Sequence, residues 1–106
     1  MLQREELLKI LREVKLKLQE ILGDDLVEVV LFGSYARGEA TDESDVDLLV
    51  VVKRRPTLEE HDRLNEATEK YAIEMGLVIS FIFYPLSAGM EHDPLIQNAR
   101  AEGLKV

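Results

Sequence analysis

The chain has 106 residues, of which 46% are hydrophobic and 32% charged; this balance fits a folded globular domain and excludes a disordered or fibrous chain. A chain of this length can bury roughly two-thirds of its surface, so we expect residues 1–106 to form a single domain. The absence of cysteine excludes thiol catalysis and thiolate metal sites. No apolar run approaches a membrane span and the first residues lack the order of a signal peptide, which predicts a soluble cytoplasmic protein without a membrane partner.

The charge balance limits the partners. Thirteen Lys and Arg against 21 Asp and Glu give a net charge of −8. Binding to long nucleic acid depends on cationic side chains that replace counterions, so this class of partner is disfavoured. A small phosphorylated ligand that arrives with Mg²⁺ stays compatible with the charge, because the metal reverses the local sign. The basic run 53–55 is interpreted as a solvated edge, with contact to an acceptor or a phosphate tail as the alternative.

Hydrophobic periodicity predicts one helix and two strands in the first half. Residues 2–22 carry an apolar stripe at helical spacing, and Gly23 is placed to end that helix. The Val- and Leu-rich segments 26–32 and 45–52 predict two buried strands. Only about twelve residues separate these strands, which is the minimum for a parallel crossover, so we expect an antiparallel pair.

The second half predicts a helix, a strand and a last short helix. Thr57 and Glu60 have the spacing of a capping box, which begins a helix that reaches residue 76. We expect the inner face of that helix to contain Leu64, Ala67, Tyr71, Ala72 and Met75. A third strand is predicted over 77–84, parallel to the second, and a helix over 93–103. The fold class is therefore α/β, a small mixed sheet of about three core strands with flanking helices.

A candidate phosphate-binding turn follows the first strand. That strand ends in Gly33-Ser34, and the next residues are able to form a helical turn. Glycine permits close backbone approach, and free N–H groups at the start of a helix bind anions. Ser34 adds a hydroxyl donor, and Arg37 adds a cation one turn later.

Two carboxylates begin the second strand. Asp45 and Asp47 stand at i and i+2, so both side chains leave the same face, about 7 Å apart at Cα. Such a pair repels itself unless a divalent cation lies between, and Mg²⁺ binds carboxylate and phosphate oxygens together. Taken singly, the Gly-Ser turn, the Asp pair and the arginine are ordinary surface features. Their combination at adjacent strand ends favours metal-assisted chemistry on a nucleoside triphosphate.

Gly33-Ser34, ten intervening residues and then Asp45-Val46-Asp47 form a motif within the run LFGSYARGEATDESDVDLLV. This motif resembles the signature of the minimal nucleotidyltransferases of the DNA polymerase beta superfamily, and it implies a polymerase beta-like core. The resemblance implies that Gly33 and Ser34 hold the phosphates and that Asp45 and Asp47 are catalytic Mg²⁺ ligands. Arg37 is expected to stabilise charge. The implied reaction moves a nucleoside monophosphate, expected to be AMP from ATP, to an acceptor and releases pyrophosphate.

The third strand departs from the family pattern. The resemblance implies a third carboxylate on this strand, which helps to hold the metal and to activate the acceptor hydroxyl. Here the polar residue of the strand is Ser80, and a serine hydroxyl is a weak neutral ligand and no useful base near pH 7. We therefore expect binding of nucleotide and Mg²⁺, with slow transfer by the chain alone.

Three functions are compatible with these residues. The first is an enzyme whose acceptor is a partner protein, since the resemblance implies pairing with HEPN-domain proteins in toxin–antitoxin modules. The second is a catalytically weak nucleotide-binding module of the same fold that works through a protein partner. The third is a structural domain that has lost its ligand. The sequence leaves the base preference, the acceptor and homo-oligomerisation open.

Overall fold

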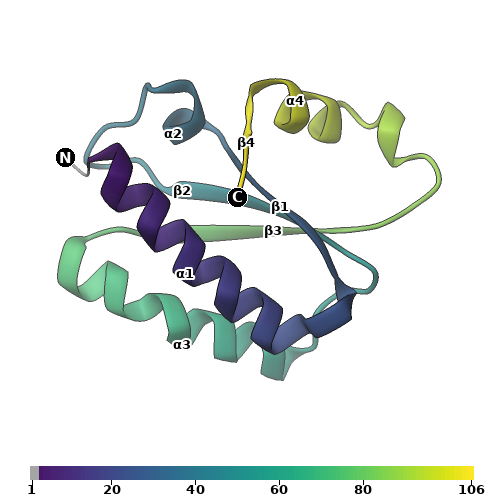
Figure 1. Cartoon of the computed structure of the whole chain (residues 1–106), viewed down its shortest axis with the longest axis horizontal. Coiled ribbons are helices and arrows are strands. Elements are labelled where there is room, and N and C mark those ends of the chain that lie inside the picture. Colours follow the sequence, from purple (N-terminus) through teal and green to yellow (C-terminus); the bar gives the residue numbers. More distant parts are fainter. Residues whose placement is uncertain (1–2) are drawn as a thin grey trace.

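The computed structural model describes residues 3–106, in which helices and strands alternate along most of the chain (Figure 1). Helix α1 spans Arg4–Leu22, strand β1 Leu26–Phe32, helix α2 Ser34–Arg37 and strand β2 Val46–Val52. Helix α3 spans Leu58–Met75, strand β3 Ile79–Pro85, helix α4 Pro94–Glu102 and strand β4 Leu104–Lys105. Short 3₁₀ turns, η1 (Gly23–Asp25) and η2 (Met90–His92), follow α1 and precede α4.

The strands form one mixed sheet in the order β3-β2-β1-β4. Strand β1 runs antiparallel to β2, and β2 runs parallel to β3, which confirms both predicted pairings. The fourth strand was not predicted. With two residues, β4 is too short to carry a periodic signal, and it forms only because Leu104 and Lys105 pair with Leu31 and Val30 of β1.

The two faces of the sheet are covered by different helices. Alternation along β2 directs Val46, Leu48 and Val50 into the core formed with α1 and α3. Leu49 and Val51 point the other way, into a smaller cluster with Ile96 and Ala99 of α4. The α1 and α3 helices lie side by side on the first face (Figure 1). Asp47 shares the second face and is half-buried there.

The long helices follow their predicted patterns with two exceptions. The capping box of Thr57 and Glu60 is present at the start of α3. Leu64 and Tyr71 are buried, whereas Ala72 and Met75 are exposed, contrary to the expected inner face. The chain turns at Gly76, so that Leu77 packs into the core and the side chains of the last helical turn do not. No helix in the described part of the chain is long and apolar enough to cross a membrane.

Strand β3 begins and ends later than predicted. Residues 77 and 78 are irregular, because Leu77 closes the turn after α3 by donating its amide to the Tyr71 carbonyl. Pro85 was expected to end the strand but belongs to it. A proline is tolerated there because β3 is an edge strand and the missing N–H would face away from β2.

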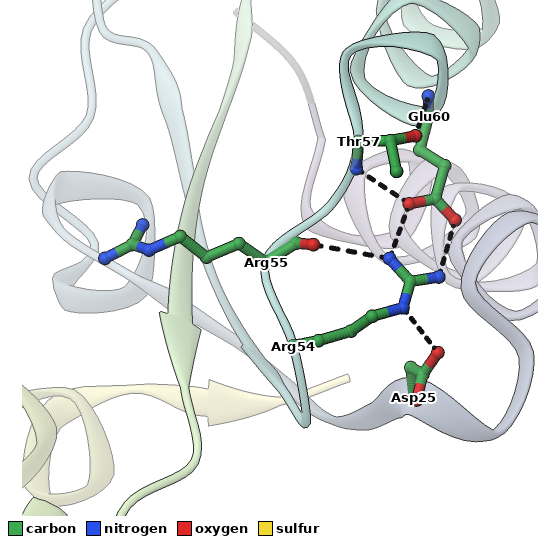
Figure 2. Close-up of polar contacts among 5 residues, drawn as sticks. All are labelled: Asp25, Arg54, Arg55, Thr57 and Glu60. Carbon is green, nitrogen blue, oxygen red and sulfur yellow. Dashed lines mark hydrogen bonds and ion pairs between the residues drawn. The ribbon is translucent and has the colours of Figure 1, made fainter.

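The basic run after β2 is not simply a solvated edge. Arg54 donates two hydrogen bonds to the Glu60 carboxylate, at 2.7 and 2.9 Å, and a third to Asp25 at 2.9 Å (Figure 2). Glu60 also accepts from the Thr57 amide, so one arginine connects η1 to the start of α3. These ion pairs lie at the end of β2 opposite Asp47, about 20 Å away along the strand. That distance argues against contact between Arg54 and a phosphate bound near Asp47.

Candidate active site

The turn after β1 is shaped by glycine. Gly33 has φ 77° and ψ −157°, a conformation that is essentially restricted to glycine. Its carbonyl accepts from the amides of Ala36 and Arg37 at 3.1 and 3.2 Å, which closes the single turn of α2. The amides of Ser34 and Tyr35 come first in that turn and have no acceptor within it. The predicted helical turn is thus present, with its first donors at the end of β1.

Asp47 lies directly against this turn. A Cβ atom built on Gly33 would lie 2.5 Å from Oδ2 of Asp47, so any larger residue would displace the carboxylate. In the sheet, Asp47 pairs with Phe32 on β1 and with Ser80 on β3. The fold therefore brings Gly33, Asp47 and Ser80 together from three separate segments.

The charge environment of Asp47 disfavours its ionised form. Burial raises the pKa of this carboxyl above its ordinary value, and the nearby Asp45 carboxylate raises it further. Arg37 opposes both effects. Asp45 is exposed and lies just before β2 rather than within it, at the same i and i+2 spacing as predicted. A cation between the two carboxylates would relieve their repulsion.

Arg37 is surrounded by carboxylates. Its Nε donates to Glu39 at 3.1 Å, and its Nη1 lies 3.9 Å from the carboxylate of Glu102 at the end of α4. The side chain is exposed and still acts electrostatically on Asp47. Periodicity could not have found Glu102, because only the packing of α4 against β1 brings it to Arg37.

The loop before Asp45 is ordered by its own hydroxyl groups. The Thr41 amide donates to the Ser44 hydroxyl at 2.9 Å, and the Ser44 amide donates to the Thr41 carbonyl at 3.0 Å. The Val46 amide then donates to the Val78 carbonyl and starts the pairing with β3. The sequence analysis predicts no element for this segment, although the pair of hydroxyl residues three apart is a signal that favours a local turn.

The chemistry of these donors fits Mg²⁺. Asp45 and Asp47 provide hard oxygen ligands beside a turn whose amides suit a phosphate, and Mg²⁺ binds through one or two carboxylates plus substrate phosphates. Among residues 3–106, no group of three or more His, Cys, Asp or Glu side chains converges as a metal site. Further ligands would therefore be phosphate oxygens, water or groups of another molecule.

The third strand places Ser80 where it was expected. Ser80 pairs with Asp47 in register and lies on the same face of the sheet. Glu74, the acidic residue before this strand, is exposed on α3, where its charge acts on Tyr71. The described part of the chain therefore offers Ser80, and not a carboxylate, next to Asp47 on β3.

Comparison with known proteins decides the family. The nucleotidyltransferase domain family matches residues 11–103. The chain belongs to this family. It is therefore a nucleotidyltransferase, as the motif predicted.

Relatives of this nucleotidyltransferase share much of its length. A Methanocaldococcus jannaschii protein, provisionally named protein adenylyltransferase MJ0141, is 43% identical over 79 residues, which are 74% of this chain and 80% of that protein. The protein adenylyltransferase MntA of Thermococcus cleftensis is 44% identical over 69 residues, or 65% and 68% of the two chains.

Solved structures share the fold. A protein described provisionally as a minimal nucleotidyltransferase has a TM-score of 0.61 at 32% identity and covers 95% of this chain and 94% of its own. A toxin–antitoxin structure with AMP-PNP has a TM-score of 0.58 at 21% identity, covering 87% and 68%. At that identity the second likeness is one of fold alone. Together they confirm the polymerase beta-like α/β core that the motif implied.

Proposed function

We propose that this nucleotidyltransferase transfers AMP from Mg²⁺-bound ATP to a hydroxyl group of a partner protein. The observation that carries the proposal is the Asp47 carboxylate, which packs against the Gly33 turn and lies close enough to Asp45 for the two charges to repel each other. Two curated relatives bear the name protein adenylyltransferase, which supports ATP as the donor and a protein as the acceptor. The cytoplasm, where ATP is available, is the compartment we propose.

Each residue of the site has a separate role in this reaction. The Gly33–Ser34 turn binds phosphate oxygens through amides and the Ser34 hydroxyl. Asp45 and Asp47 would hold Mg²⁺, which would supply charge neutralisation on the triphosphate. Arg37 lies one turn away and stabilises the negative charge of the phosphates.

The reaction balances as a displacement at the α-phosphorus. The acceptor oxygen forms a bond to the α-phosphorus, and the bond from that phosphorus to the oxygen bridging to the β-phosphate breaks. Pyrophosphate leaves, and the hydroxyl proton passes to a base. Because Ser80 cannot serve as that base near pH 7, a group of the partner or water accepts the proton.

The partner we propose is a HEPN-type protein. The resemblance of residues 31–50 to minimal nucleotidyltransferases supports this pairing, with a tyrosine as the acceptor. The net charge of −8 favours a protein over a long nucleic acid.

A catalytically weak nucleotide-binding module is the second candidate. It is favoured by Ser80, which stands in register with Asp47 where a third carboxylate would complete the ligand set. Such a module would bind ATP with Mg²⁺ and associate with a protein without modifying it.

Direct measurement of label transfer separates these candidates. The chain is incubated with Mg²⁺, ATP labelled on its α-phosphate and a candidate HEPN-type protein, and protein-bound label is counted. We expect label on the partner with the parent, none with Asp45→Asn or Asp47→Asn, and parental transfer with the control Asp24→Asn, an exposed aspartate in η1. Mg²⁺-dependent ATP binding without any transfer would favour the second candidate. Equal transfer by all variants would refute the site.

A further inference from the structure

The outer edge of β3 is open. In the described part of the chain β3 pairs with β2 alone, and every one of its residues is at least partly exposed, whereas six of the seven residues of β2 are buried. Figure 1 shows β3 on the side of the sheet away from β4. Such an edge presents unpaired backbone donors and acceptors to another chain.

The hydrogen-bond pattern identifies which groups face outward. The Val46 amide donates to Val78, and the Leu86 amide donates to Val52, at the two ends of the parallel ladder. Bonding residues alternate along a parallel strand, so the even-numbered residues of β3 face β2. The backbone groups of Ile79, Phe81 and Phe83 therefore point to the open edge.

An acidic groove borders the start of this edge. The groove has a volume of about 640 Å³ and lies between α3 and the beginning of β3. Its wall contains Asp62, Glu66 and Glu69, and no Lys or Arg lines it. The groove between α1 and α3 differs, because Lys17 and Lys70 are among the residues that line it. Of these two grooves, the one beside β3 is thus better suited to a cationic segment.

We propose that the edge of β3 and this groove, together the β3-edge groove, dock an extended, Lys- or Arg-rich segment of the acceptor protein as an added strand. This inference rests on the proposed function, in which the acceptor is a protein. The outward backbone groups of β3 provide the hydrogen bonds of the added strand, and the carboxylates of α3 pair with its cations. Val78 and Ile82, 48% and 38% exposed, provide apolar contact.

A second copy of the chain fits this surface poorly. Pairing of β3 with β3 would join two chains that each carry a net charge of −8 and an acidic wall of Asp62, Glu66 and Glu69 beside the shared edge. Like charges placed opposite each other disfavour an interface. The charge pattern therefore favours a basic partner over a second copy of the chain.

The added strand would also reach the active site. Phe32, Asp47 and Ser80 form a row across β1, β2 and β3 on one face of the sheet. A strand paired with β3 continues that row at about 4.8 Å spacing and sets one partner side chain beside Ser80. That place lies on the same face as Asp47 but two strand spacings, about 10 Å, away from it, so a long partner side chain is needed to bring an acceptor hydroxyl to Asp47.

Two variants with matched controls test the docking surface. The double variant Glu66→Lys with Glu69→Lys reverses the charge of the groove wall. Its control, Glu74→Lys, makes the same kind of charge change on the Tyr71 side of α3. Phe81→Pro removes an outward amide, and Phe81→Ala removes the same ring while keeping that amide. The probe is a labelled ten-residue peptide of alternating Lys and Val, with a Glu and Val peptide as its acidic counterpart, and fluorescence anisotropy measures binding.

We expect the basic peptide alone to bind the parent. Binding should be about tenfold weaker for the wall reversal, parental for Glu74→Lys, and weaker for Phe81→Pro than for Phe81→Ala. Thermal unfolding and ATP-Mg²⁺ binding establish that each variant is folded. Failure of the parent to bind, equal binding of both peptides, or a dimer of the chain that Phe81→Pro dissolves would overturn the inference.

Transfer assays with the same variants keep the two proposals apart. If AMP reaches a protein acceptor equally well with the wall reversal and with Phe81→Pro, the docking inference is wrong and the proposed function stands. If the peptide binds as expected and no protein is modified, the docking surface stands and the proposed function fails.

Discussion

Replacement of Gly33 by alanine tests the contact on which the candidate site depends. The added Cβ would lie 2.5 Å from Oδ2 of Asp47, so the carboxylate must move. The backbone at Gly33 also has φ 77° and ψ −157°, which alanine adopts only under strain. We therefore expect both the stability and the nucleotide affinity to fall.

The expected loss of stability follows from these two terms. The backbone strain costs about 1–3 kcal/mol, and displacement of Asp47 from its rotamer adds about 1 kcal/mol. The sum is roughly 2–4 kcal/mol, which for a domain of this size lowers the melting temperature by on the order of 15 °C. Gly38→Ala is the matched control, because Gly38 also has positive φ but has no atom within 4 Å of its added Cβ. That control should lose only about 1–2 kcal/mol.

Two measurements decide the outcome. Urea denaturation gives the free energy of unfolding, and calorimetric titration with ATP and Mg²⁺, well below the melting temperature, gives the affinity. Gly33→Ala should bind at least about tenfold more weakly than the parent, while Gly38→Ala should bind as the parent does. Parental affinity in a folded Gly33→Ala variant would refute the assignment of this turn to the phosphates.

Four further changes address the site and its support. Burial raises the pKa of Asp47, so its ionised form costs stability at neutral pH, and without ligand Asp47→Asn should melt no lower than the parent. The difference in melting temperature should vanish as the pH falls and Asp47 becomes protonated. Only the parent should gain stability from ATP-Mg²⁺. Ser80→Asp should speed AMP transfer about tenfold or more, and no gain with intact ATP binding would argue for a binding module. The Arg54 ion pair lowers the pKa of Glu60 to about 2, so the ion pair stabilises the fold above the ordinary pKa of 4.5 and loses this effect as the pH falls towards 2. Glu60→Gln should therefore reduce the dependence of the melting temperature on pH in this acidic range. Burial and the Glu13 hydrogen bond raise the pKa of Tyr71 to about 12, so Tyr71→Phe should remove a phenolate absorbance step at that pH, and loss of a step near 10 would contradict this.

The local signals in the sequence sufficed for most elements and for the family. The stripe of α1, the capping box of α3 and the Val-rich β2 each depend on neighbours a few residues apart, which is why periodicity finds them. The spacing from Gly33-Ser34 to Asp45 and Asp47 likewise lies within fifteen consecutive residues.

Contacts between distant segments, in contrast, depend on the tertiary structure. The closeness of Gly33 to Asp47 and the register of Asp47 with Ser80 depend on strand pairing, which a single sequence does not encode by spacing. Glu102 reaches Arg37 only because α4 packs on β1 and the chain continues into β4. Which groups are chemically suited to phosphate and metal follows from the sequence, because it is a property of residue type and local order. Packing decides which of them meet and which edge stays open, because burial and hydrogen bonding across the sheet depend on the whole chain at once.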